Sequence, residues 1–358
     1  MEDLRETGTM KEFGHEHELG FRKDVLEPLF RSMMSAESCF LVGAGSIGKT
    51  RIIDHMIRTD VRGYYLGANF GQTLIIRLDM NRLSEYTEWE FYELMLFNII
   101  QTIGQSENKE LDKLSSEIML KFLMPILDSP EKPTKALRFL ELAITKILMA
   151  DEKLFLCFLL DEFDDAYPKL PAKLFAHLRG IRDTNKNRLC YALFLRNLPR
   201  VVRPAKDHEG FYELFSRTMI KIGPYSKDDS ISMLKQLESR KNIPVQLPVT
   251  FDKIYFAAGG HPGMMQAIFG FLAYMSETDP NLVDVNWLVE QDNVKEECQK
   301  LFDSLETLEK DALVTFAKDR TRPGREAASS LIAKGLVKLQ DRNLIIFSPV
   351  FEQFLRNQ

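Results

Sequence analysis

Residues 43–50 read Gly43-Ala44-Gly45-Ser46-Ile47-Gly48-Lys49-Thr50, which matches the pattern G-x-x-x-x-G-K-[S/T] in full. The apolar run 39–42 comes directly before this segment and stops at its first glycine, as a short buried strand does. Apolar residues at helical spacing follow between positions 51 and 58. The pattern therefore stands in the strand–loop–helix context that a phosphate-binding loop requires.

The residue types of this loop suit nucleotide phosphates. Glycines let successive backbone N–H groups turn toward phosphate oxygens, and a helix beginning at Lys49 adds its positive end. Lys49 is expected to neutralise the β- and γ-phosphates, and the Thr50 hydroxyl to hold Mg²⁺. We therefore predict that ATP or ADP binds to the whole loop 43–50 and to the next residue, Arg51.

Apolar runs and helical patterns alternate on both sides of the loop. Strands are expected at 39–42, 74–79, 154–160, 190–195 and 218–222. Helices are expected near 25–30, 51–58, 89–103, 118–127, 134–149 and 170–182. The run 154–160 has no polar side chain, as in a strand that is buried on both faces of a parallel sheet. The alternation predicts a doubly wound α/β domain with a mainly parallel sheet.

Two acidic residues, Asp161 and Glu162, end the apolar run 154–160. The carboxyl ends of parallel strands meet at the sheet edge where ligands bind. Asp161 is therefore predicted to contact Mg²⁺, and Glu162 to act as the general base that orients and deprotonates the attacking water. The pair Asp164-Asp165 is ambiguous, and a solvated start of the following loop is the preferred interpretation.

A further polar pair, Arg196-Asn197, ends the strand 190–195. If this strand lies beside the acidic one, both side chains come near the γ-phosphate. Arg196 would then stabilise charge in the way an arginine finger does in cis, and Asn197 would polarise the water. The alternative is an ordinary surface arginine after a strand.

Beyond residue 224 the strand signals disappear. Helices are expected at 227–240, 251–258 and 263–275, and then at 294–302, 304–318 and 324–335. A β-ribbon over 336–347 and a short helix complete the chain, in the order of a winged helix. We predict a flexible tail (1–20), a P-loop ATPase core (21–223), a helical lid (224–290) and a winged-helix domain (291–358), with no role assigned to 105–150.

Composition narrows the function classes. Among 358 residues, 47 basic and 52 acidic side chains give a formal charge of -5, which disfavours a strongly basic nucleic-acid binder but not a local basic patch. The four cysteines form no CxxC pair, so a structural zinc site is not expected, and buried thiols indicate a reducing compartment. The acidic N-terminus is unlike a signal peptide, and no apolar run is long enough for a membrane span. A cytoplasmic protein without a membrane partner is expected.

Several motifs together resemble the AAA+/STAND ATPases. They are GAGSIGKT (43–50), FLLDEFDD (158–165), FLRN (194–197), IGPYS (222–226) and GGHPGMMQ (259–266). Phe21-Arg22 resembles that family's short motif on the adenine side. The resemblance covers roughly residues 20–350, and it implies a three-layer α/β/α P-loop NTPase with a five-stranded parallel sheet, a helical lid and a winged helix. It also implies that Pro224 contacts the base or ribose and that His261 contacts a phosphate, with helix capping as the alternative for His261.

The resemblance implies a nucleotide-operated switch. AAA+ machines usually carry a lid arginine near the position of Gly263, and its absence here favours the STAND-like switch over a processive remodeller. Expected partners are the nucleotide, further copies of the chain in the ATP state, and a separate effector or sensor protein. The alternative is a DNA-associated AAA+ ATPase that binds through Arg320, Arg322 and Arg325. A non-catalytic nucleotide-binding scaffold is a third reading, against which the presence of Glu162 speaks.

Overall fold

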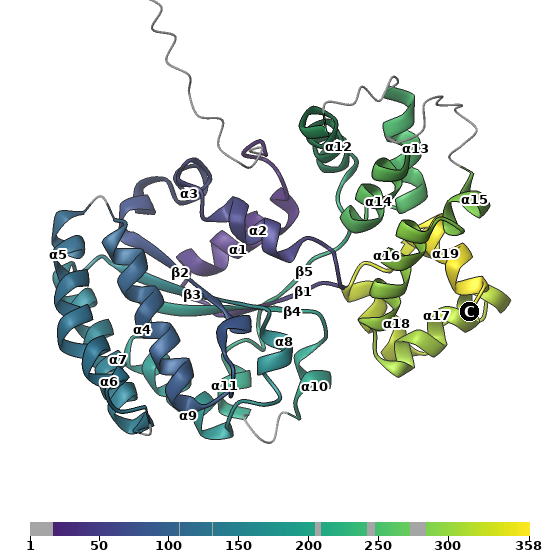
Figure 1. Ribbon diagram of the computed structural model, residues 1–358. Helices are drawn as coiled ribbons and strands as arrows, with labels where there is room; N and C mark the ends of the chain where they lie inside the picture. Colours follow the sequence, from purple (N-terminus) through teal and green to yellow (C-terminus); the bar gives the residue numbers. More distant parts are fainter. Residues whose placement is uncertain (1–16, 107, 131, 205–208, 242–247, 273–283) are drawn as a thin grey trace, which may run out of the picture.

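The structure is a computed structural model that describes residues 17–358 except 107, 131, 205–208, 242–247 and 273–283. Residues 1–16 of the predicted tail (1–20) therefore lie outside the described residues. Figure 1 shows two bodies, an α/β body with a central sheet and a helical body that contains the C-terminus.

A five-stranded sheet forms the centre of the first body. Its strands are β1 (Cys39–Val42), β2 (Thr73–Asp79), β3 (Phe155–Asp161), β4 (Leu189–Leu195) and β5 (Met219–Lys221). They lie in the order β2-β3-β4-β1-β5, and every neighbouring pair is parallel. The five strands confirm the predicted strand segments and the predicted α/β fold class.

Helices cover both faces of the sheet, which gives three layers (Figure 1). One face packs against α1 (Lys23–Met34), α2 (Lys49–Met56) and α3 (Thr59–Leu66). The other face packs against α4 (Glu88–Gly104), α7 (Pro133–Ala150) and α9 (Ala172–Thr184). Successive residues of β1 alternate between the two cores, as the period of a strand requires.

Shorter elements complete this body. They are the 3₁₀ turns η1 (Gly67–Gln72) and η2 (Met80–Arg82), α5 (Lys109–Ile118), the π turn η3 (Met119–Leu123), α6 (Met124–Leu127), α8 (Phe163–Ala166), α10 (Pro199–Val202) and α11 (Glu209–Glu213). The segment 105–150 thus forms helices that extend the layer of α4.

The second body is helical, as predicted. Its elements are α12 (Lys227–Lys241), α13 (Pro248–Ala258), α14 (Pro262–Leu272), α15 (Val285–Val289), α16 (Asp292–Asp303), α17 (Thr307–Asp319), α18 (Arg325–Ala333), the antiparallel pair β6 (Val337–Gln340) and β7 (Asn343–Ile346), and α19 (Pro349–Arg356). From α16 onward the chain forms three helices and then a β-ribbon, which is the predicted order. Side chains from α13 to α19 share one apolar core, so the predicted lid and C-terminal unit are packed together. The domain boundaries stay a prediction.

The strand order places the predicted site. Because β4 lies between β1 and β3, the phosphate loop after β1 and the acidic end of β3 flank the polar end of β4. Among the described residues, no helix is long and apolar enough to cross a membrane.

Candidate nucleotide-binding site

The phosphate loop joins β1 to α2 and contains two residues with positive φ, Ser46 at 53° and Gly48 at 88°. Lys49 begins α2 and folds its side chain back over the loop. Its Nζ donates to the carbonyl oxygens of Gly43, at 3.0 Å, and Ala44, at 3.1 Å. The curled loop therefore holds the ammonium at its centre.

The charge of Lys49 is poorly compensated. The side chain is buried, and burial lowers its pKa to about 8, an effect that the nearby carboxylates of Asp164 and Glu162 only partly oppose. Among the described residues, no ion pair of Lys49 with a carboxylate is found. A buried ammonium with only carbonyl acceptors is costly, so the loop fits a bound anion such as a nucleotide phosphate.

Tyr225 is a second residue that fits a ligand bound at the loop. Its hydroxyl is buried and has no hydrogen-bond partner among the described residues. A Cβ atom added to Gly48 would lie 2.6 Å from this hydroxyl, so the tyrosine closes one side of the loop. A buried hydroxyl without a partner is unusual, and a phosphate or ribose oxygen at the loop would satisfy it.

Asp161 ends β3, as predicted, and is almost fully buried. Its carboxylate accepts a hydrogen bond from Arg77 on β2, with Nη2 and Oδ2 2.7 Å apart. The other end of the Arg77 guanidinium bonds Asp54 on α2, also at 2.7 Å. Thr50, the second predicted Mg²⁺ residue, is exposed on the first turn of α2.

Glu162 has a left-handed backbone, with φ 52°, between β3 and α8. Positive φ is rare for residues other than glycine, and such residues concentrate at functional sites. The carboxylate is 29% exposed and lies 3.5 Å from Nη2 of Arg196. The structure therefore brings the predicted base and the predicted arginine together.

Asp164 is not solvated, so the preferred sequence-based interpretation is wrong for this residue. It is buried, and its carboxylate accepts hydrogen bonds from the backbone N–H of Arg196, at 2.7 and 2.8 Å, and of Asn197, at 3.3 Å. Burial raises its pKa above the usual value, although Lys49 acts in the opposite direction. Asp165 is exposed and pairs with the Arg196 side chain at 3.2 Å. The turn after β3 thus holds the end of β4 in place.

Asn197 contacts the second body. Its side-chain oxygen accepts a hydrogen bond from Lys334, at the end of α18, over 2.5 Å. Lys334 also pairs with Glu309 on α17 at 2.6 Å, and both side chains are buried. Lys334 of the second body therefore covers Asn197, which is part of the polar pair predicted at the end of β4.

Two further side chains of the second body contact Gly45 of the phosphate loop. The Gly45 N–H donates to the Ser304 hydroxyl at 3.3 Å. His261 is fully buried, with its Nε2 3.1 Å from the Gly45 carbonyl oxygen and its Nδ1 3.3 Å from the Met264 N–H. Because Nε2 donates to the carbonyl and Nδ1 accepts from the amide, this imidazole is neutral and caps α14. Its contact with a phosphate stays a prediction.

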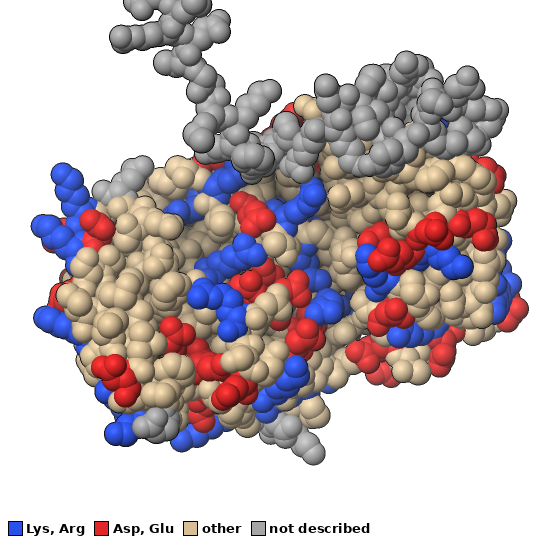
Figure 2. All heavy atoms as spheres, viewed as in Figure 1, with Lys and Arg blue, Asp and Glu red and all other residues tan. Residues whose placement is uncertain are grey.

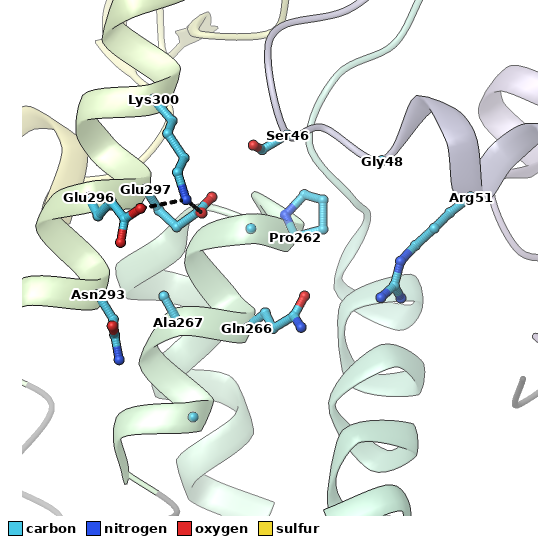
Figure 3. Close-up of a pocket in the computed structure, with 12 residues that line it drawn as sticks. Ser46, Gly48, Arg51, Pro262, Gln266, Ala267, Asn293, Glu296, Glu297 and Lys300 are labelled. Atoms are coloured by element: carbon cyan, nitrogen blue, oxygen red, sulfur yellow. Dashed lines mark hydrogen bonds and ion pairs between the residues drawn. The ribbon is translucent and has the colours of Figure 1, made fainter. Parts of the chain in front are cut away.

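A cavity of about 520 Å³ opens beside the loop (Figure 3). Ser46 and Arg51 line one side, and Gln266 of α14 and Lys300 of α16 line the other. Lys300 is neutralised by Glu296 and Glu297, at 2.9 and 3.1 Å. The volume lies within the range of small-molecule sites, so the cavity has room for part of a nucleotide.

The motif predicted for the adenine side packs at the junction of the two bodies. Phe21 stacks on His17, with ring centroids 3.7 Å apart. Arg22 is buried, with its guanidinium 4.9 Å from the centroid of the Tyr225 ring. Pro224 lies against Gly335, where an added Cβ would come within 2.6 Å of it. The predicted contact of Pro224 with a base or ribose stays a prediction.

Sequence reasoning misses four residues of this site, which are Arg77, Tyr225, Ser304 and Lys334. Arg77 gives a signal, because it is a charged residue inside an apolar strand. Tyr225 belongs to the motif IGPYS (222–226), but the resemblance assigns no role to the tyrosine. Ser304 and Lys334 give no local signal, since they reach the site only through the packing of the two bodies.

Many solved structures resemble this chain, and three of them serve as examples. A Walker-type ATPase of Pyrococcus abyssi is 16% identical, covers 94% of this chain and 97% of its own, and has a TM-score of 0.53. The ORC2 protein of Aeropyrum pernix, in ADPNP–ADP complexes, is 14% identical (94% and 91% covered, TM-score 0.47). The ORC1 protein of Aeropyrum pernix, in complex with DNA, is 12% identical (97% and 95% covered, TM-score 0.44). Since the last two TM-scores lie below 0.5, only the first supports a conclusion about the fold.

No protein-family model matches the sequence, and no curated protein sequence matches it. The similarity to the Walker-type ATPase extends over nearly the whole length of both chains. Together with the parallel order β2-β3-β4-β1-β5, it shows that this chain has the α/β fold of a P-loop NTPase, with a helical C-terminal region.

Proposed function

We propose that this protein binds and hydrolyses ATP and acts as a molecular switch whose C-terminal helices dock on the nucleotide site or leave it. The contacts at Gly45 carry the proposal, because Ser304 accepts its N–H and His261 contacts its carbonyl. In a phosphate loop these N–H groups bind phosphate oxygens. A bound phosphate therefore competes with Ser304, so that nucleotide binding and docking of the second body are linked.

The residues present fit the chemistry of ATP hydrolysis. Lys49 and the loop N–H groups would hold the phosphates, and the exposed Thr50 hydroxyl and Asp161 would hold Mg²⁺. Bound Mg²⁺ supplies positive charge that offsets the charge developing on the phosphates. Glu162 would then orient and deprotonate the attacking water, with Arg196 beside it to stabilise negative charge.

The test measures mass and shape in solution with ADP and then with ATP and Mg²⁺. Glu162→Gln should bind ATP, hydrolyse it at least tenfold more slowly and remain in the ATP form. Lys49→Ala should bind neither nucleotide and show no change. A parent protein that binds neither ADP nor ATP would contradict the proposal. A Glu162→Gln variant with parental turnover would instead favour a scaffold that does not use this base.

The finer parts of the proposal concern partners and setting. We expect the ATP form to expose surface for further copies of the chain or for a separate effector or sensor protein. The four described cysteines are free and buried, which suits a reducing compartment such as the cytoplasm. The absence of an arginine near Gly263 supports the STAND-like type of switch.

Association with DNA is the second candidate. Arg320, Arg322 and Arg325 are exposed around the start of α18, the last of the three helices that precede the β-ribbon. Arg320 is partly neutralised, because it pairs with Glu352 at 2.7 Å. The face in Figure 2 carries interleaved acidic and basic side chains, so a DNA contact would be local to the α18 region.

Retention on duplex DNA tests this candidate. We expect binding at low salt that weakens steeply as salt rises. Changing the three arginines to alanine should abolish it, whereas Arg138→Ala, on the exposed face of α7, should not. Equal retention of the triple variant and the parent would remove DNA as a partner of this region.

A further inference from the structure

Lys334 is a buried cation that belongs to the second body but reaches the nucleotide site. Its side chain is 1% exposed, and that of its partner Glu309 is 4% exposed. Burying two charges is unfavourable unless their hydrogen-bonding groups are well satisfied. Here the pair is short, at 2.6 Å, and it is anchored within the second body.

The carboxylate of Glu309 fixes the position of this cation. Besides Lys334, it accepts the Ser330 hydroxyl at 2.5 Å and the Glu306 N–H at 2.9 Å. The last contact belongs to a capping box at the start of α17. Three donors therefore hold the carboxylate, and the ammonium is presented at a defined point on the surface of the second body.

The ammonium meets the first body at Asn197, where Nζ and Oδ1 are 2.5 Å apart. An amide NH₂ group cannot face an ammonium, because both are donors only. Lys334 therefore fixes the orientation of the Asn197 amide, with its oxygen toward Lys334 and its NH₂ group directed away. The Asn197 backbone is fixed separately, since its N–H donates to Asp164.

The neighbouring backbone places this contact at the junction between the bodies. Gly335 follows Lys334 with φ 70°, and an added Cβ would lie 2.6 Å from Pro224 and 2.8 Å from Gly223. Gly223 and Pro224 follow β5, where the chain leaves the sheet for α12. Any shift of the second body thus moves Lys334 relative to Asn197.

We infer that Lys334 is a positioning residue for ATP hydrolysis, which turns the Asn197 NH₂ group toward the attacking water or the γ-phosphate only when the second body returns to the ATP-bound site. The inference rests on the proposed ATPase function and adds to it a physical link between docking and the chemical step. Lys334 acts through Asn197 and is not itself placed on the substrate.

The test is steady-state ATP turnover of the full chain. Lys334→Met alone leaves Glu309 buried without its cation and can unfold the protein, so the main variant is K334M combined with E309Q. We expect kcat to fall at least tenfold while KM for ATP changes less than threefold. Lys338→Met, an exposed lysine on the adjacent β6, should behave like the parent.

A double-mutant cycle separates positioning from general destabilisation. In an Asn197→Ala background, the K334M/E309Q change should alter kcat less than twofold, because its target is gone. An equal loss with and without Asn197, or a kcat within twofold of Lys338→Met, would overturn the inference. A parent that binds ATP but never hydrolyses it would contradict the proposed function itself, and the inference with it.

Discussion

Arg77 and Asp161 form an ion pair across the β2–β3 edge of the sheet, with Nη2 and Oδ2 2.7 Å apart. Asp79, not Arg77, lies directly opposite Asp161 in the parallel register, so the arginine reaches its partner diagonally on the same face. Its other Nη bonds Asp54 of α2. The aspartate expected to contact Mg²⁺ is thus already beside a fixed cation that also holds the helix after the phosphate loop.

Arg77→Met should therefore change both stability and the response to Mg²⁺. Among the described residues, it leaves the buried Asp161 carboxylate with one backbone donor, the Glu162 N–H at 3.0 Å. Because Arg77 is partly exposed, we expect a loss of about 2 kcal/mol, below the ~3–5 kcal/mol of a fully buried pair. Mg²⁺ with ADP should then raise the melting temperature more in the variant than in the parent, since it supplies the missing charge.

The measurement is thermal unfolding with ADP in the presence of either Mg²⁺ or a chelator. Arg138→Met serves as the matched control, because this arginine is 71% exposed and pairs with Glu141 on the same helix, α7. An Mg²⁺ response that is the same in Arg77→Met and in the control would show that Asp161 does not bind the metal.

Gly48→Ala should weaken nucleotide binding. Its φ of 88° is unfavourable for alanine, and the new methyl group would lie 2.6 Å from the Tyr225 hydroxyl. We expect ADP affinity to fall at least tenfold and the free energy of unfolding to drop by about 1–3 kcal/mol. Gly180→Ala is the control, since open space surrounds that helical glycine, and alanine should stabilise α9 slightly.

Tyr225→Phe in the Gly48→Ala background tests the cause of that effect. Removing the hydroxyl relieves the contact, so part of the lost stability should return. Fluorescence titration with a labelled ADP and chemical unfolding give the two readouts. A double variant no more stable than Gly48→Ala would show that backbone strain alone is responsible.

Nucleotide affinity should fall as pH rises above about 8. Burial lowers the pKa of Lys49 to about 8, so the free protein loses this charge above that pH. Phosphate oxygens favour the charged form, and binding must then take up a proton, which weakens affinity up to about tenfold per pH unit. Calorimetric titration at pH 8.5 in two buffers should detect the uptake. Lys49→Arg keeps its charge, and its affinity should not change between pH 7.5 and 9.5.

The fold could be predicted because the decisive signals are local. The apolar run 154–160 and the acidic residues after it lie next to each other in the sequence, and a parallel sheet necessarily brings its strand ends to one edge. By the same reasoning, Arg196 lies near the acidic residues if the strand 190–195 is beside 154–160, and in the structure Glu162 and Arg196 are 3.5 Å apart.

The partners of these residues could not be predicted, since they depend on strand order and on how the two bodies pack. Arg77 and Asp161 are 84 positions apart in the sequence, and they meet only because β2 and β3 are neighbours in the sheet. Lys334 reaches Asn197 across 137 positions, and nothing in the sequence near either residue indicates the contact. The sequence suggests a solvated loop residue at Asp164, because the two backbone N–H groups that donate to its carboxylate leave no trace in the side-chain pattern.

His261 should make stability depend on pH in the mildly acidic range. Burial, together with the nearby charge of Lys49, lowers its pKa to about 4 from an ordinary value of 6.5. Between these values the unfolded chain binds a proton that the folded chain does not, so stability falls as pH decreases from 6.5 to 4. One such group contributes a slope of about 1.4 kcal/mol per pH unit.

The slope can be isolated with His261→Gln, whose amide can still donate to Gly45 and accept from Met264. His55, with a pKa also lowered to about 4 by burial and by Arg58, titrates in both proteins and cancels in the comparison. Urea unfolding at pH 5 and 6 should therefore give a slope about 1.4 kcal/mol per pH unit smaller in the variant. Equal slopes would mean that His261 is charged in the folded protein, and a protonated imidazole beside the phosphate loop would then favour its role as a phosphate ligand over helix capping.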